Sequence, residues 1–339
     1  IFSSNLTKND FNNSKSINGF ISSQFLLLLK MDWTDKKVLV TGGSGFLGSR
    51  VVKLLEEKHA DVITTRSSEC DLRLRENCEK ITKDLDYVFH LAAKVGGIGL
   101  NQKKPGELFY DNLIMGVNLM EESRKNNILK FIALGTICSY PKFTPLPFSE
   151  KSIWDGYPEE TNAAYGLAKK MLLVQSQAYR QQYDFHAIAI FPTNLYGPND
   201  NFNEISSHVI PAIIKKIFDA KKKNHNFISL WGDGTPTRDF LYVDDAAYGL
   251  VLAAEKYDKP DPINLGSGIE ISIRELSEKI LNIMNCDLEI KWEVDKPNGQ
   301  PRRCVSIEMA KREIDFKPQI RLDEGLKRTI NWYESKFSL

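Results

Sequence analysis

Short apolar runs alternate with longer segments of helical periodicity between residue 37 and about residue 192. Runs of four to six residues rich in Val, Ile, Leu and Phe are typical of strands buried on both faces. Strands that alternate with helices predict an α/β fold with a Rossmann-like, doubly wound parallel sheet. The predicted strands are 38–41, 61–65, 86–91, 130–134 and 186–190, and the helices between them include 46–58, 111–126 and 163–182.

The pattern changes after about residue 192, where Gly, Pro and Asn cluster at 194–200. Apolar runs at 240–243 and 262–265 predict two more strands, which either rejoin the first sheet or form a small second one. We expect a nucleotide-binding domain and a smaller C-terminal α/β domain that binds substrate. The first covers 31–195, with 240–266 rejoining it, and the second covers 196–239 and 267–335.

Residues 1–30 differ from the rest of the chain, because they are rich in Asn and Ser and do not begin with Met. The apolar run at 25–29 is shorter than the roughly 7–15 residues of a signal-peptide core. We expect the native protein to start at Met31, with 1–30 a disordered segment or a non-native leader. An inefficient targeting sequence is the alternative.

The charges are balanced, with 45 basic and 44 acidic residues and a formal net charge of +1. This balance gives no support for nucleic acid or an anionic membrane as the main partner. The five cysteines form no Cys-x-x-Cys pair and no His/Cys metal spacing, so we expect no metal site and a reducing, cytoplasmic location. No apolar run approaches the ~18 residues of a membrane-spanning helix.

A glycine-rich turn joins the first predicted strand to the first predicted helix. It reads as G-x-x-G-x-x-G through Gly42, Gly45 and Gly48, or as G-x-G-x-x-G from Gly43. Glycine permits a tight turn and a close approach to a pyrophosphate, and the following helix directs its N–H groups at the anion. The turn therefore predicts a dinucleotide site.

The end of the second predicted strand bears on the choice of cofactor. Sites for NAD usually place an acidic residue there to bind the ribose 2′-hydroxyl. This strand instead ends at Arg66, and no acid follows until Glu69. Arg66 favours the 2′-phosphate of NADP, and the alternative is an ordinary surface arginine.

A candidate catalytic group lies in the middle of the chain. Tyr165 and Lys169 are four residues apart in a predicted helix and so share one face. A neighbouring ammonium can lower the pKa of a phenol that donates a proton. The hydroxyl of Thr136 and the thiol of Cys138 could complete a site that moves protons and polarises a carbonyl.

Six sequence blocks, in the same order, resemble the extended short-chain dehydrogenase/reductase family over nearly all of 37–335. Within this family the chain is most similar to epimerase/reductases that act on GDP-4-keto-6-deoxy-D-mannose. The resemblance implies 3,5-epimerisation and NADPH-dependent 4-reduction to GDP-L-fucose, in a homodimer formed by the helices 111–126 and 163–182. The blocks lie at 91–98, 134–142, 165–169, 192–198, 207–211 and 231–240.

The resemblance also implies a role for each matching residue. Tyr165 is the general acid at O4, Lys169 lowers its pKa and holds the nicotinamide ribose, and Thr136 binds the carbonyl. Cys138 and His208 are the acid/base pair for epimerisation. The residues implied at the cofactor are Gly42, Ser44, Gly45, Phe46, Leu47, Gly48, Arg66, Leu91, Ala93, Lys169, Pro192, Asn194, Leu195 and His208. Those implied at the substrate are Asn194, Lys216, Trp231, Arg238, Asn298 and Arg302.

The implied chemistry agrees with the residue types. A ketone at C4 acidifies the C3 and C5 protons, and inversion needs one group to remove a proton and another to return it on the opposite face. The pKa values of thiols and imidazoles lie within reach of neutrality, so both forms are accessible. Taken alone, Cys138 is typical of a small buried hydrophobe and His208 of a capping or core histidine. Trp231 and Arg238 alone suggest a core residue and a salt bridge.

Three other functions remain open. A nucleotide-sugar 4-epimerase would retain NAD and would not need the Cys138/His208 pair. A 4,6-dehydratase of this family would carry an Asp-Glu pair where this chain has Ile137 and Cys138. A non-catalytic nucleotide-binding paralogue would often lack the tyrosine or the lysine.

Overall fold

The computed structural model describes residues 31–204, 206–296 and 298–337. The expectations for 1–30 lie outside the described residues. The chain separates into two units, Ile1–Trp33 and Thr34–Leu339. Because 34–339 form one compact unit, the division into a nucleotide-binding and a substrate-binding domain stays a prediction, and we describe two regions within this unit.

The first region contains a six-stranded, all-parallel sheet in the order β2-β1-β3-β4-β5-β9. Helices pack on both faces, so the strands β1, β3, β4, β5 and β9 are mostly buried, whereas the edge strand β2 is partly exposed. The predicted parallel sheet is confirmed. The strands are β1 (Lys37–Thr41), β2 (Asp61–Thr65), β3 (Tyr87–His90), β4 (Lys130–Leu134), β5 (Ala187–Pro192) and β9 (Ile263–Leu265).

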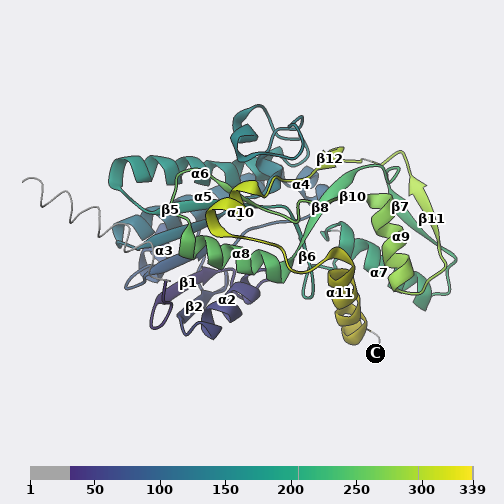
Figure 1. Cartoon of the computed structure of the whole chain (residues 1–339), viewed down its shortest axis with the longest axis horizontal. Helices are drawn as coiled ribbons and strands as arrows, with labels where there is room; N and C mark the ends of the chain where they lie inside the picture. Colours follow the sequence, from purple (N-terminus) through teal and green to yellow (C-terminus); the bar gives the residue numbers. More distant parts are fainter. Residues whose placement is uncertain (1–30, 205, 297, 338–339) are drawn as a thin grey trace, which may run out of the picture. The chain divides into compact units, whose positions relative to one another are not determined.

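Helices α5 and α6 pack together on one face of this sheet, and α2 and α8 pack together on the other (Figure 1). Helix α5 begins six residues before its predicted start, since Pro105 occupies its first turn, where the missing N–H costs nothing. The helices of this region are α2 (Gly48–Glu57), α3 (Arg75–Ile81), α4 (Ile98–Lys103), α5 (Pro105–Lys125), α6 (Ala163–Tyr183), α8 (Val243–Lys256) and α10 (Glu308–Ile314), with short 3-10 turns η1 (Ile137–Ser139) and η2 (Glu150–Trp154).

The second region contains two small sheets and three helices around a separate apolar core. One sheet has the order β10-β8-β12 with β6 beside β8, and the other pairs β11 with β7. Ile213, Ile217 and Ile280 are among its buried residues. The elements are β6 (Asn194–Tyr196), β7 (Phe227–Trp231), β8 (Thr237–Tyr242), β10 (Glu270–Ser272), β11 (Glu289–Glu293), β12 (Arg302–Arg303), α7 (Val209–Lys222), α9 (Ile273–Ile283) and α11 (Leu322–Phe337).

One expectation about the sheets needs correction. The strand predicted at 240–243 does not rejoin the first sheet, because β9 occupies the position beside β5. Residues 240–242 belong to β8, which pairs with β6, β10 and β12. Only the strand predicted at 262–265 rejoins the first sheet. The strand order of this sheet reverses on either side of β1, which is where open α/β sheets form their ligand crevice.

Candidate active site

A cavity of about 1320 Å³ runs past the carboxyl ends of β1 to β5 and is closed by residues of the second region. Single small-molecule sites usually measure about 300–1,000 Å³, so this cavity has room for a dinucleotide and a second ligand. All the predicted site residues line it except Lys169 and Arg302.

The glycine turn after β1 forms one wall and requires its glycines. Gly42 has a φ of 69°, a conformation that side chains disfavour. A Cβ on Gly48 would lie 2.0 Å from the carbonyl oxygen of Gly42. No side chain caps the N-terminus of α2, and its first turn contains no acidic residue, so its positive end can receive a pyrophosphate.

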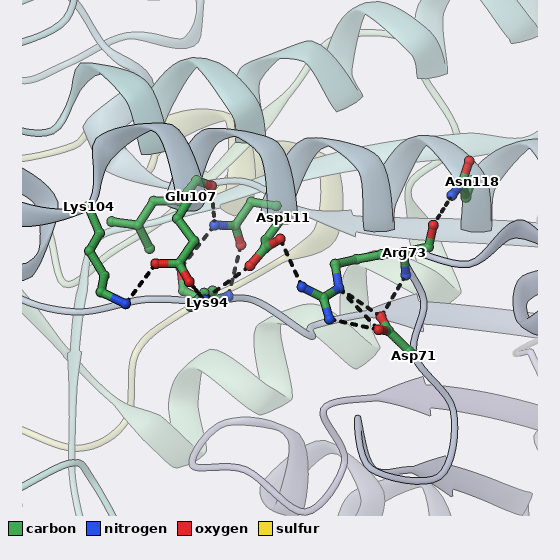
Figure 2. Close-up of polar contacts among 9 residues, drawn as sticks. Asp71, Arg73, Lys94, Lys104, Glu107, Asp111 and Asn118 are labelled. Carbon is green, nitrogen blue, oxygen red and sulfur yellow. Dashed lines mark hydrogen bonds and ion pairs between the residues drawn. The ribbon is translucent and has the colours of Figure 1, made fainter.

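Charged side chains hold the loops after β2 and β3 against α5 (Figure 2). The buried carboxylate of Asp111 accepts hydrogen bonds from Arg73 Nη1 at 3.2 Å and Lys94 Nζ at 3.1 Å. Lys94 also donates to Glu107 at 2.6 Å, and Lys94 and Lys104 together lower the pKa of Glu107 to about 2. Asp111 therefore joins two cavity loops, the first of which contains Arg66.

Cys138 and Tyr165 come together through a close approach of η1 to α6. A Cβ on Gly166 would lie 2.2 Å from the carbonyl oxygen of Cys138, so only glycine permits this approach. The hydroxyl of Thr136 accepts a hydrogen bond from the N–H of Cys138 at 3.3 Å and caps η1. The resulting wall presents a hydroxyl, a thiol and a phenol to the same cavity.

Lys169 lies behind this wall, one turn further along α6. Its Nζ is buried without a hydrogen-bond partner among the described residues, and burial lowers its pKa to about 8. Burial and then the nearby Cys138 raise the pKa of Tyr165, opposite in direction to the lowering expected from Lys169. An unpartnered buried ammonium next to the cavity fits a ligand with ribose hydroxyls, and the glycine turn fits its pyrophosphate.

His208 reaches the cavity from the second region. It occupies the N-cap position of α7, but its side chain does not cap that helix. Cys138 follows β4 of the first region, so the two members of the predicted acid/base pair come from different regions and face one cavity.

Four of the residues predicted at the substrate lie in the part of the cavity formed by the second region. Lys216 Nζ donates to the carbonyl of Ser229 at 2.6 Å. The side-chain oxygen of Asn298 accepts from the N–H of Asp233 at 3.0 Å and supports the turn after β7. Trp231 is half exposed, and burial followed by the nearby Arg303 lowers the pKa of Arg238 to about 9. These side chains provide cations and an aromatic face.

Arg302 lies outside the cavity, and its predicted role at the substrate stays a prediction. Arg302 Nε donates to Glu270 at 3.0 Å on the exposed side of β12, outside the cavity. Arg303 lines the cavity instead, because successive side chains of a strand point to opposite faces. The sequence block contains both arginines, but only the pairing of β12 with β8 decides which one faces inward. The sequence also did not predict a role for Gln300, whose side-chain oxygen accepts a hydrogen bond from Arg303 Nε. This contact likewise depends on the position that the pairing of β12 with β8 gives to Arg303.

The family model described as the NAD dependent epimerase/dehydratase family matches residues 38–266. The chain belongs to this family. A GDP-L-fucose synthase from Sinorhizobium fredii is 39% identical, covering 88% of this chain and 95% of the relative. A GDP-L-colitose synthase from Yersinia pseudotuberculosis is 31% identical, covering 88% of this chain and 97% of the relative.

A comparison with a solved structure shows that the fold is similar as well. The structure of a GDP-L-fucose synthetase from Naegleria fowleri bound to NADP has a TM-score of 0.80 and 27% identity, covering 90% of this chain and 96% of that one. The resemblance drawn from the six blocks is confirmed by these relatives. The roles of individual site residues stay predictions.

Proposed function

We propose that this protein converts GDP-4-keto-6-deoxy-D-mannose to GDP-L-fucose by NADPH-dependent 3,5-epimerisation and 4-reduction, a step of nucleotide-sugar biosynthesis. The observation that carries the proposal is the shared cavity. It combines the hydroxyls of Thr136 and Tyr165 with the thiol of Cys138 and the imidazole of His208. The named GDP-L-fucose synthases support the choice of substrate.

NADP(H) fits the end of the cavity formed by the first sheet. The turn through Gly42 and Gly48 would hold the pyrophosphate, Arg66 the 2′-phosphate, and Lys169 the nicotinamide ribose. When bound, the cofactor supplies the hydride that reduces C4. The remaining steps are proton transfers performed by residues of this chain.

Epimerisation uses the acidity of the protons next to the ketone. Cys138 and His208 face the cavity from different regions, so one can remove a proton from C3 or C5 while the other returns a proton to the opposite face. The electron pair of the broken C–H bond moves to O4, where Thr136 and Tyr165 donate hydrogen bonds to the enolate oxygen.

Reduction uses the proton of Tyr165. Burial and Cys138 raise its pKa, so the phenol is protonated before the reaction and is available as a donor to O4. Lys169, one turn away, places a positive charge where the phenolate forms. Because its pKa is lowered to about 8, Lys169 is mostly charged at neutral pH.

A related GDP-4-keto sugar is the second candidate substrate, favoured by the similarity to a GDP-L-colitose synthase. The test follows NADPH absorbance at 340 nm with GDP-4-keto-6-deoxy-mannose and identifies the product by NMR. We expect oxidation of NADPH and GDP-L-fucose as the product. Turnover of another nucleotide sugar, with none of this one, would show that the proposed substrate is wrong.

We also propose a cytoplasmic homodimer that pairs α5 and α6 of two subunits. Large apolar side chains on these helices are exposed, including Phe109, Tyr110, Val174 and Tyr183. All five cysteines are free, as a reducing compartment requires, and no helix among the described residues has the length and hydropathy to cross a membrane. Light scattering after size-exclusion chromatography should give twice the subunit mass, and a monomer would exclude the dimer.

A further inference from the structure

Arg303 contacts the thiol that the proposed function assigns to epimerisation. Its Nη1 donates to Cys138 Sγ at 3.5 Å, within the range for a hydrogen bond to sulfur. Both residues line the cavity, although 165 positions separate them in the sequence.

The position of Arg303 is held from two sides. Its Nε donates to Gln300 Oε1 at 2.7 Å, and the Gln300 amide donates to the carbonyl of Lys142 at 3.2 Å. Its backbone belongs to β12, which pairs with β8 so that Arg303 lies opposite Arg238. The residue is 6% exposed, so its guanidinium is largely removed from bulk water. This support keeps the donor directed at the sulfur.

The surroundings of Arg303 favour a negative charge on Cys138. Arg303 and Arg238 bring two guanidinium groups to adjacent strands of the same cavity. A guanidinium within hydrogen-bond distance of a sulfur stabilises a thiolate relative to the neutral thiol.

We propose that Arg303 is a positioning residue that stabilises the thiolate of Cys138 and fixes the direction of its sulfur. The thiol proton leaves to solvent, and the sulfur lone pair is then free to accept a proton from C3 or C5 of the substrate. The role in epimerisation rests on the proposed function. The effect on the reactivity of the Cys138 thiolate does not rest on the proposed function, because this reactivity is a property of the enzyme without substrate.

The test measures alkylation of Cys138 by iodoacetamide at pH 7 in the full chain, followed by peptide mass spectrometry. Arg303→Met keeps the length of the side chain and removes the donor, and should slow alkylation of Cys138 by about tenfold. Arg303→Lys keeps the charge and should recover part of the rate. Cys286, which is partly exposed in the second region, is the internal reference and should react equally in all variants.

Two further variants control for indirect effects. Arg312→Met removes an exposed arginine paired with Glu313 and should leave the alkylation of Cys138 unchanged. Gln300→Met removes the anchor of Arg303 and should give an intermediate rate, which provides a second test if Arg303→Met does not fold. Folding is checked by circular dichroism.

Equal alkylation of Cys138 in folded Arg303→Met and the unchanged chain would overturn the proposal. Slower alkylation together with slower solvent deuterium incorporation into GDP-4-keto-6-deoxy-mannose would support it. Normal alkylation with slower deuterium incorporation would also overturn it, because Arg303 would then act on the substrate. Slower alkylation in a protein that turns over no GDP sugar would support the effect on Cys138 and contradict only the proposed function.

Discussion

The two ends of the cavity are built differently. At the end formed by the first sheet, the walls are loops that follow parallel strands, and the glycine turn permits no added Cβ at Gly48. At the other end, the walls come from short strands such as β8 and β12. Side chains hold these strands in place, as Asp239 does by accepting hydrogen bonds from Ser267 and the N–H groups of Gly268 and Val305.

This difference separates two tasks. A tight backbone turn fits the invariant pyrophosphate of a cofactor, whereas side chains on short strands can differ between relatives that act on different sugars. Changes at the first end should therefore alter cofactor binding, and changes at the second end should alter the sugar chemistry alone. Tyr165 lies between the two ends and should matter most.

The largest effect is expected from Tyr165→Phe, which removes the proton donor to O4. We expect kcat for ketone reduction to fall by about 10²–10⁴-fold, the usual contribution of a positioned general acid. Absorbance at 340 nm measures this rate. Tyr157→Phe is the matched control, since this tyrosine is 63% exposed and does not line the cavity. A loss of less than threefold in Tyr165→Phe would remove this tyrosine from the mechanism.

Cys138→Ser tests whether the two chemical steps are separate. We expect deuterium incorporation from solvent at C3 and C5 to fall by about 10²-fold, because a serine hydroxyl is a far weaker base at neutral pH. Ketone reduction remains possible, and NADPH affinity stays unchanged. NMR of the product measures the incorporation, with Cys286→Ser as the control. Normal incorporation in Cys138→Ser would show that another group is the base.

Gly48→Ala tests the rigid end of the cavity. The added Cβ meets the Gly42 carbonyl at 2.0 Å, so the turn must shift. Overpacking of this kind costs about 1–3 kcal/mol, and the Kd for NADPH should rise by about tenfold or more. Fluorescence titration measures the Kd. Gly106→Ala is the control, because nothing lies within 4 Å of its added Cβ. An unchanged Kd in Gly48→Ala would mean that the turn is not the pyrophosphate site.

The pH dependence of the free energy of unfolding should test Asp239, which holds the strands at the second end of the cavity. Burial raises the pKa of Asp239 to about 6. A carboxyl that holds its proton more tightly in the folded chain reduces stability as pH rises from about 4 to about 6, by about 2 kcal/mol for this group. Asp239→Asn should remove that decline, as measured by urea unfolding at several pH values in this window. Equal slopes for the variant and the unchanged chain would contradict the assignment.

The smallest effect is expected from Arg302→Met. Its ion pair with Glu270 is exposed, and such pairs contribute at most about 1 kcal/mol to stability. We expect kcat/KM to change by less than about threefold, since Arg302 does not line the cavity. A loss above tenfold would show that Arg302, rather than its neighbour, serves the substrate.

The first sheet was predictable in detail because its signals are local. The strands at 61–65 and 130–134 match their predictions residue for residue, and the glycine turn occupies its expected place between β1 and α2. Helix ends were less predictable, as the early start of α5 at Pro105 shows. The strand at 240–243 was expected in either of two sheets, and only its pairing with β6 decided between them, because a short apolar run does not specify which strand it pairs with.

The amino-acid order alone determined the parallel sheet, the glycine turn and the presence of a tyrosine, a lysine and a thiol suited to reductase and epimerase chemistry. These features depend on neighbours in sequence, through strand and helix periodicity and the conformational freedom of glycine. Only the tertiary structure decided that Arg303 rather than Arg302 faces the cavity and that Lys169 lies buried behind Tyr165. Both outcomes depend on strand pairing and helix packing between segments that are distant in sequence, which local patterns do not encode.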